Sequence, residues 1–137
     1  IGSQSAGEKY NLSPIAKVTA ITTTGLEPRI MGMGPYPATE KLLRKTGLKT
    51  SDIDLFEINE AFASQVLAVL RKLGIPDDAD SVNVNGGAIA LGHPLGMSGA
   101  RITGTAAREL QNRGAHRAIA TMCIGVGQGI SILLEAV

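Results

Sequence analysis

Short apolar or β-branched segments alternate along this chain with longer segments whose apolar residues recur at helical spacing. That alternation is typical of layered α/β domains built on a largely parallel sheet. We expect strands over five segments: 15–24, 55–58, 82–85, 115–122 and 129–136. A tight glycine turn joins the last two segments, which predicts that they pair antiparallel.

Helices are expected over three segments: 37–46, 60–73 and 100–113. Gly47 and Gly114 follow the first and the last of these, in the position where glycine commonly ends a helix. The proline- and glycine-rich segment 25–37 is expected to be a loop. Residues 1–14 are polar and weakly patterned, so we interpret them as a connector from a missing N-terminal part, followed by a domain over 15–137.

The composition fits one ordinary globular domain. With 137 residues, of which 44% are hydrophobic and 18% charged, the chain is long enough for a real core. A net charge of +1 gives no electrostatic argument for binding nucleic acid or an anionic membrane, and no apolar stretch would span a bilayer. The one cysteine cannot form an internal disulfide. We therefore expect a cytoplasmic or organelle-matrix protein. Because the chain begins at Ile1, we interpret it as an excised piece, whose targeting segment, if any, would lie upstream.

The segment Asn85–Arg101 is rich in glycine yet too apolar for a surface linker. Glycine permits positive φ angles and lets a ligand or a second strand approach the main chain closely. His93 lies in the middle of this segment, just ahead of an expected helix whose first N–H groups are unpaired. The segment alone also fits a phosphate-binding loop or a structural turn, and His93 alone also fits a core histidine bound to a backbone carbonyl.

Two further polar residues follow expected strands. Asn59 comes directly after the second strand, and Cys123 directly after the fourth, ahead of the glycine turn. Because ligands of open α/β sheets gather beyond the carboxyl ends of the strands, we expect Asn59, His93 and Cys123 to converge. Asn59 could instead cap the next helix, and Cys123 could be a small buried apolar side chain. Acid/base chemistry by Cys123 would be favoured by a thiol pKa below its ordinary value, which loop N–H groups such as that of Gly125 would provide.

Three motifs occur in a fixed order: Asn59-Glu60-Ala61-Phe62, Gly92-His93-Pro94 and Cys123-Ile124-Gly125. Together they resemble the C-terminal half of the thiolases, the enzymes that make or cleave 3-ketoacyl-coenzyme A (CoA), over about 13–137. The resemblance implies half of a thiolase fold, with a five-stranded mixed sheet and helices on both faces. In the full enzyme such a half stacks against a similar N-terminal half, so an isolated half would leave an apolar face uncovered.

The resemblance also implies roles for individual residues. In the family, the asparagine matched by Asn59 fixes a catalytic water. The histidine matched by His93 forms an oxyanion hole with that water and activates a nucleophilic cysteine. The cysteine matched by Cys123 acts as acid and base, Gly125 belongs to the oxyanion-hole set, and Met97 lies in a stretch that borders the acyl pocket. The nucleophilic cysteine belongs to the N-terminal half and has no counterpart here, so we predict that the isolated chain is inactive.

The implied partners are CoA and acyl-CoA as substrates, an N-terminal thiolase half, and further copies in a homodimer or homotetramer of the full enzyme, with no other cofactor and no metal. The alternative is a noncatalytic module that pairs with another subunit or binds a CoA moiety, which the missing nucleophile would fit. Ketoacyl synthases, with a second histidine in place of Asn59, and sterol-carrier-linked thiolases, with His-Asp-Cys-Phe over 59–62, match the residues less well. The motifs around His93 and Cys123 resemble those of degradative thiolases, such as those of fatty-acid β-oxidation or those acting on 3-oxoadipyl-CoA.

Overall fold

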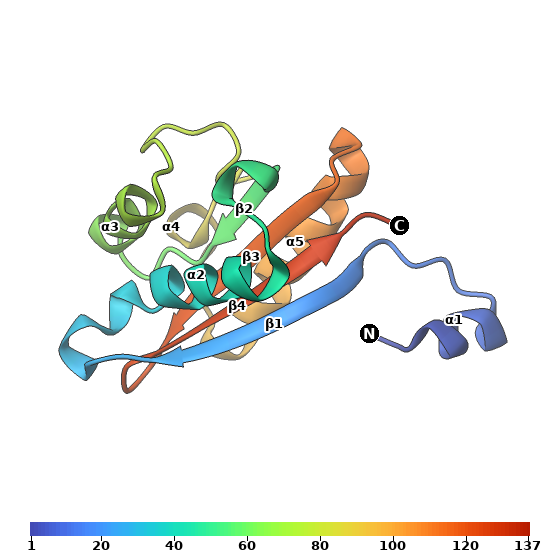
Figure 1. Cartoon of the computed structure of the whole chain (residues 1–137), viewed down its shortest axis with the longest axis horizontal. Coiled ribbons are helices and arrows are strands. Elements are labelled where there is room, and N and C mark those ends of the chain that lie inside the picture. The colour runs from blue at the N-terminus through green and yellow to red at the C-terminus, as the bar shows by residue number, and fades with distance from the viewer.

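A four-stranded mixed sheet forms the centre of the computed structural model, which describes all 137 residues (Figure 1). The strands are β1 (Lys17–Gly25), β2 (Leu55–Ile58), β3 (Arg117–Ile124) and β4 (Gln128–Glu135). Their order across the sheet is β1-β4-β3-β2, with β2 and β3 parallel and the other two pairs antiparallel. The antiparallel pairing of the last two strands is therefore confirmed, and the α/β class is as expected.

The fifth strand expected over 82–85 is wrong. Only Val82 makes a β-bridge, to Phe56 of β2, because Asn83 takes a left-handed conformation with a φ of 46° that turns the backbone away. The Asn83 side chain continues the pairing instead. Its Oδ1 accepts from the N–H of Ile58 at 2.8 Å, and its Nδ2 donates to the Ile58 carbonyl at 2.9 Å. An amide side chain thus takes the two ladder positions that another strand would have used.

Helices cover both faces of the sheet (Figure 1). The α-helices are α1 (Gln4–Tyr10), α2 (Pro35–Thr46), α3 (Ala63–Leu73), α4 (Ala88–Leu91) and α5 (Leu95–Arg113), with 3-10 turns η1 (Pro28–Met33) and η2 (Thr50–Asp52). Helix α2 packs on β1, β3 and β4 and against α3, whereas α5 packs on β2, β3 and β4 from the opposite side. Gly47, Gly74 and Gly114 end α2, α3 and α5 with positive φ, as the glycine positions predict.

Strand alternation divides the core into two clusters. Phe56 and Ile58 of β2 face α2 and α3 in a cluster of 13 buried residues, whereas Leu55 faces α5 in a cluster of six that includes Ala106 and Leu110. Glu57, between Phe56 and Ile58, must therefore point toward α5, although it carries a carboxyl group. Every residue of β2 is buried, which fixes the carboxyl end of this strand in the middle of the domain.

A chain of buried hydroxyl groups joins α2 to the sheet. Thr121 of β3 donates to the Ile130 carbonyl at 2.8 Å, so its oxygen accepts from Ser131 of β4, 2.7 Å away. The Ser131 oxygen then accepts from Thr39 of α2 at 2.9 Å. Each hydroxyl has one proton to donate, so the direction of the whole chain follows from its first bond.

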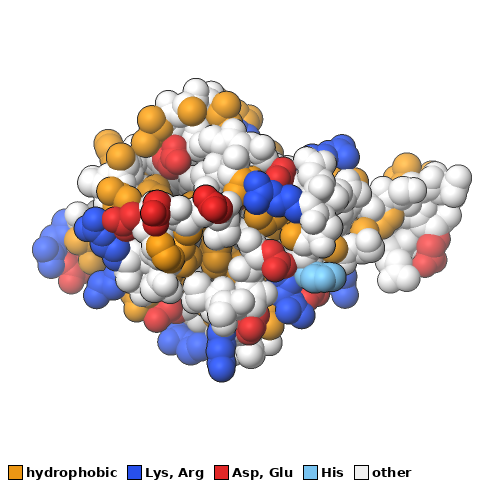
Figure 2. All heavy atoms as spheres, turned by 90° about the horizontal axis from the view of Figure 1, so that it is seen from above, with side chains coloured by type: hydrophobic (Ala, Val, Ile, Leu, Met, Phe, Trp, Pro, Cys, Tyr) orange, Lys and Arg blue, Asp and Glu red, His pale blue; other side chains and the backbone are white.

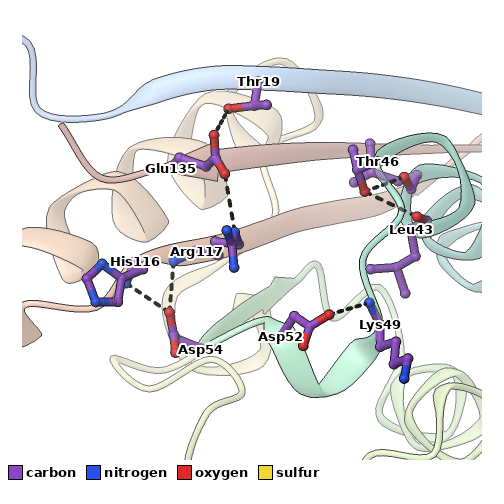
Figure 3. Close-up of polar contacts among 10 residues, drawn as sticks. Thr19, Leu43, Thr46, Lys49, Asp52, Asp54, His116, Arg117 and Glu135 are labelled. Carbon is purple, nitrogen blue, oxygen red and sulfur yellow. Dashed lines mark hydrogen bonds and ion pairs between the residues drawn. The ribbon is translucent and has the colours of Figure 1, made fainter.

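The end of the sheet away from the three motifs carries a polar network (Figure 3). The Asp54 carboxylate accepts from the backbone N–H groups of His116 and Arg117, both at 2.8 Å, and so ties the start of β2 to the start of β3. Glu135 accepts from Thr19 at 2.7 Å and from Arg117 at 3.2 Å, joining three strands. These contacts hold the amino ends of β2 and β3 in register.

The N-terminal residues form an element that the sequence did not suggest. Segment 1–14, interpreted as a connector, contains α1, whose first turn is capped by Ser3 accepting from the N–H of Ala6 at 3.1 Å. This helix buries none of its residues and lies apart from the sheet (Figure 1). On the face shown in Figure 2, acidic and basic side chains are interspersed among hydrophobic ones. None of the helices combines the length and apolar character needed to cross a membrane.

Candidate active site

Asn59 directly follows β2, which ends beside Thr121 of the parallel strand β3, three residues before β3 itself ends. Its backbone N–H donates to the Thr121 carbonyl of β3 at 3.0 Å, which continues the ladder one residue beyond the strand. The side chain is fully buried. Asn59 does not cap the following helix, because α3 begins only at Ala63, and its N-cap residue is Phe62. Asn59 is therefore not a helix cap, which was the alternative role.

Asn59 and His93 meet through their side chains. The Asn59 Nδ2 lies 3.3 Å from the His93 Nε2, and the Nδ1 on the other side of the imidazole lies 2.6 Å from the Oγ of Ser98. Ser98 donates its single hydroxyl proton to the Pro94 carbonyl at 3.1 Å, so toward His93 it can only accept. The proton of a neutral His93 therefore sits on Nδ1, and Nε2 presents a lone pair to the Asn59 amide.

The glycine-rich loop is held in place by Glu60. This carboxylate accepts from Asn83 Nδ2 and from the backbone N–H of Ile89 in α4, both at 2.9 Å. A Cβ on Gly87 would overlap the Glu60 carboxyl group, so only glycine fits there. Glu60 therefore neither lies at the N-terminus of α3 nor contacts His93; it anchors the loop that carries the histidine.

A second carboxylate ties the same loop to α5. Asn85 donates to Glu109 at 2.9 Å, and Arg113 pairs with the same carboxylate at 2.5 Å. Hydrogen bonds from Asn85 and then Arg113 hold the pKa of the Glu109 carboxyl below its ordinary value. The loop before His93 is thus attached to β2 through one acidic residue and to α5 through another.

Helix α5 begins five residues earlier than its predicted start at residue 100. Pro94 is the N-cap, and its carbonyl accepts from the N–H groups of Met97 and Ser98. Met97 therefore lies in the first turn of a helix and not in a loop; its side chain is 40% exposed. Ser98, on the same turn, is fully buried, which explains how it reaches His93.

Cys123 lies at the end of β3 and is 6% exposed. Burial raises the pKa of its thiol above the ordinary value, opposite to the lowering we expected. No hydrogen bond joins the N–H of Gly125 to the sulfur, and Gly125 is exposed in the turn to β4. In the isolated chain the thiol is therefore a protonated, poorly acidic group.

Strand alternation gives the direction of the Cys123 side chain. Met122 contacts α5 at Gly99, so Cys123 points to the opposite face, which η1 and α2 cover. Its strand partner Gly129 packs so tightly on Gly34 that neither position has room for a Cβ. Asn59 is level with Met122 and faces α5, on the other side of the sheet, and no hydrogen bond links Cys123 to Asn59 or His93. The structure therefore brings Asn59 and His93 together but not Cys123, and the convergence of all three on one substrate stays a prediction. A substrate touching all three would lie across the ends of β2 and β3.

Large apolar side chains are exposed in the segments that carry the motifs. They are Phe62 (68%), Ile89 (66%), Leu91 (57%), Leu95 (82%) and Val126 (84%). Single exposed apolar residues are ordinary on a protein surface, but these five belong to the segments that carry the three motifs. That an isolated half leaves an apolar face uncovered stays a prediction.

The motifs did not identify every residue of the site. Ser98 contacts His93 directly, and its position five residues after the histidine, in the first turn of a helix, is the only sequence feature that could have indicated it. Asn83, which supports both Ile58 and Glu60, was assigned to a strand.

Comparison with known proteins agrees with the motifs. The family model for the thiolase C-terminal domain matches residues 12–136. A 3-oxoadipyl-CoA/3-oxo-5,6-dehydrosuberyl-CoA thiolase from Escherichia coli K12 is 56% identical over all 137 residues. An acetyl-CoA acetyltransferase from Syntrophomonas wolfei is 50% identical over 134 residues, 98% of this chain. The chain spans 34% of the length of each of these two relatives.

Solved structures show the same fold. Human mitochondrial 3-ketoacyl-CoA thiolase superposes with a TM-score of 0.94 at 48% identity, covering 99% of this chain and 34% of the human one; a complex of the human enzyme with CoA matches equally well. The acetyl-CoA acetyltransferase of Bacillus anthracis gives a TM-score of 0.93 at 44% identity, over 98% of this chain and 34% of the other. The fold is thus that of one part of these longer enzymes.

Proposed function

Because this chain belongs to the thiolase family, as its C-terminal domain, we propose that it forms part of an acyltransferase that makes or cleaves 3-ketoacyl-CoA. In this proposal the chain contributes the acid/base cysteine and oxyanion-hole residues, and a preceding thiolase N-terminal domain contributes the nucleophilic cysteine. The observation that carries the proposal is the hydrogen-bonded set of Asn59, His93 and Ser98 beyond the end of β2.

His93 would serve two steps in this reaction. Its Nε2 lone pair can take the proton of an approaching thiol, which then attacks a thioester carbonyl. Once protonated, the same nitrogen donates to the thioester oxygen as negative charge develops there, beside the water that Asn59 would hold. The Nδ1 proton stays on the ring and is donated to the Ser98 oxygen throughout, so the imidazole keeps one orientation while Nε2 gains and loses its proton.

Cys123 would move the proton of the α-carbon. A thiol whose pKa is raised by burial is protonated at neutral pH, which is the form that donates to the carbanion left when the carbon–carbon bond breaks. In the reverse direction a thiolate must form first, so condensation needs a base or a positive dipole near Cys123. The exposed Gly125 N–H is free for an acyl oxygen in this scheme.

Substrate, assembly and location follow from the relatives as proposals. Relatives named for 3-oxoadipyl-CoA or β-ketoadipyl-CoA are 54 to 56% identical to this chain, which favours a degradative role on such ketoacyl-CoA substrates. The exposed apolar side chains of the motif segments favour a partner domain and oligomeric assembly. The bacterial and mitochondrial relatives favour a cytoplasmic or organelle-matrix location.

The test separates acylation from carbon–carbon bond cleavage in a full-length protein that joins this chain to its N-terminal domain. Cys123→Ser should still be acylated on the upstream cysteine by acetyl-CoA, because thioester exchange breaks no carbon–carbon bond, but should not sustain thiolysis of acetoacetyl-CoA. His93→Ala should slow both steps, each lost oxyanion donor costing about 3 to 4 kcal/mol. Mass spectrometry after a short exposure reads acylation directly, and absorbance of the ketothioester reads thiolysis.

Two outcomes would contradict the proposal. A Cys123→Ser protein that cannot be acylated beside a His93→Ala protein that can would reverse the two roles. A wild-type full-length protein that binds CoA but neither acylates nor turns over would favour the noncatalytic module. The isolated 137-residue chain should show no turnover in either assay, because it holds only one cysteine.

A further inference from the structure

Behind the Asn59–His93 contact, the space between β2 and α5 holds polar atoms that have no partner in the chain. Glu57 is 2% exposed, and its Oε2 makes no hydrogen bond. The Nε, Nη1 and Nη2 of Arg101 are all buried and make none either. The Oδ1 of Asn59, whose Nδ2 contacts His93, is the third unpaired group.

These groups belong to the same two elements as the active-site contact. Glu57 and Asn59 are two residues apart, so they lie on the same face of the β2 segment, toward α5. Arg101 is three residues after Ser98, one turn further along the same side of α5. Asn59, His93 and Ser98 thus form one layer between β2 and α5, and Glu57 and Arg101 form the next.

The unpaired atoms are complementary in chemistry. A guanidinium only donates, whereas a carboxylate and an amide oxygen only accept. A buried polar group without a partner is costly, and native proteins satisfy nearly all of them with protein groups or ordered water. An ordered water that accepts from the Arg101 guanidinium and donates to both the Asn59 Oδ1 and the Glu57 Oε2 would give each of the three side chains a partner.

We propose that Arg101 is a positioning residue, which fixes the amide of Asn59 through a bridging water and has Glu57 as its buried counter-ion. The hydrogen bonds then run in one direction, from Arg101 through Asn59 and His93 to Ser98. A flipped Asn59 would set its oxygen against the Nε2 lone pair of His93, so a donor on the Oδ1 side keeps both residues in the reactive arrangement. The catalytic part of this inference rests on the proposed thiolase function.

The ionisation of Glu57 couples this pair to pH. Burial raises the pKa of the Glu57 carboxyl to about 7, Arg101 lowers it, and the carboxylates of Glu60 and Glu109 raise it further. Three charged groups thus face the Glu57 carboxyl: Arg101 and Glu109 from α5, and Glu60 from the loop after β2. The neighbour of Glu57 on β3 is Ala120, which does not ionise. Arg101 therefore gains its counter-ion as the pH rises through neutrality.

The test uses the full-length protein with Arg101→Met, Arg101→Lys, Glu57→Gln and, as a matched control on the exposed side of α5, Arg108→Met. Arg101→Met should lower kcat for thiolysis at least tenfold, about 1.4 kcal/mol, with KM changed less than threefold. Arg101→Lys should recover most of that loss, because an ammonium still donates, and Arg108→Met should stay within twofold of wild type. The rise of kcat through about pH 7 should disappear in Glu57→Gln.

A crystal structure of the wild-type and Arg101→Met proteins tests the positioning without turnover. We expect a water between Arg101 and the Asn59 Oδ1 in the wild type, and loss of that water with disorder or reversal of the Asn59 amide in the variant. Arg101 donating only to groups of the N-terminal domain, or an unchanged kcat in a folded Arg101→Met protein, would overturn the inference. If Arg101→Met does not fold, the wild-type structure and Arg101→Lys decide. A wild-type protein without thiolase activity refutes the proposed function, and the two structures still decide the positioning role.

Discussion

Replacing Ser98 by alanine should impair catalysis more than stability, because His93 is the group that would be left without a hydrogen-bond partner. Ser98 is fully buried, and its oxygen accepts from the His93 Nδ1 at 2.6 Å. The Pro94 carbonyl, to which Ser98 donates, also accepts from the backbone N–H groups of Met97 and Ser98. After Ser98→Ala the carbonyl therefore keeps its partners, and only the imidazole N–H loses one.

The size of the effect follows from that single orphaned donor. An unsatisfied donor in a partly buried site costs about 1 to 3 kcal/mol. An imidazole released from Ser98 is also free to carry its proton on Nε2, which removes the lone pair that takes the thiol proton. We expect kcat/KM for thiolysis to fall by roughly 10- to 150-fold, equivalent to about 1.5 to 3 kcal/mol of transition-state stabilisation. The melting temperature should fall by only a few degrees.

Thr103→Ala is the matched control. Thr103 lies on the same helix and donates its hydroxyl to the Gly99 carbonyl at 2.8 Å, as Ser98 does to Pro94, but it does not contact His93. Initial rates of acetoacetyl-CoA thiolysis and the rate of acylation by mass spectrometry should both drop in Ser98→Ala and stay near wild type in Thr103→Ala. Equal rates in the two variants would show that the hydroxyl acts through the helix and not through the histidine.

Four further substitutions test the surrounding structure. Gly87→Ala should destabilise the protein by about 1 to 3 kcal/mol, because a Cβ would overlap Glu60. Gly104→Ala, at a helical position with open space around it, should stabilise the protein by about 0.5 to 1 kcal/mol. Thermal unfolding that ranks the two variants the other way would contradict this packing. Ser131→Ala should cost about 1 to 3 kcal/mol in urea unfolding because it breaks the buried hydroxyl chain. For Glu57, the pKa of about 7 in the folded state exceeds the ordinary value of 4.5, so the folded state holds a proton that the unfolded state has already lost. The free energy of unfolding should therefore fall by about 3 kcal/mol as the pH rises from 4.5 to 7. Glu57→Gln should remove that slope, and a slope unchanged by the substitution would refute the assignment.

The sequence correctly predicted the helices and strands that end at a residue with a strong local preference. Gly47 and Gly114 ended α2 and α5 as expected, because a positive φ at the residue after a helix is a local requirement that only glycine meets easily. Asn59 directly follows β2 as predicted, since buried strands are short apolar runs bounded by polar or glycine residues. Cys123 was predicted to follow its strand but is the last residue but one of β3.

The errors arose where distant contacts override local preference. Glycines at 96 and 99 suggested a loop, yet the helix begins at Leu95, where Pro94 and the buried Ser98 support its first turn. The apolar alternation at 82–85 suggested a strand, but Asn83 bonds through its side chain to Ile58 of β2. The pKa of Cys123 was misjudged because we expected the loop N–H groups that follow it to stabilise a thiolate, whereas the packing of η1 and α2 on β3 buries the thiol.

The amide of Asn83 also limits how copies of this domain can associate. A free sheet edge is a template on which a strand of another molecule can add, and this is a common route to aggregation and domain swapping. At the outer edge of β2, the N–H and carbonyl of Ile58 are already taken by Asn83, and Phe56 is paired to Ser81 and Asn83. No foreign strand finds free ladder positions there. Assembly on this side of the domain must proceed through side chains, which allow a specific partner to be distinguished from an arbitrary extended peptide.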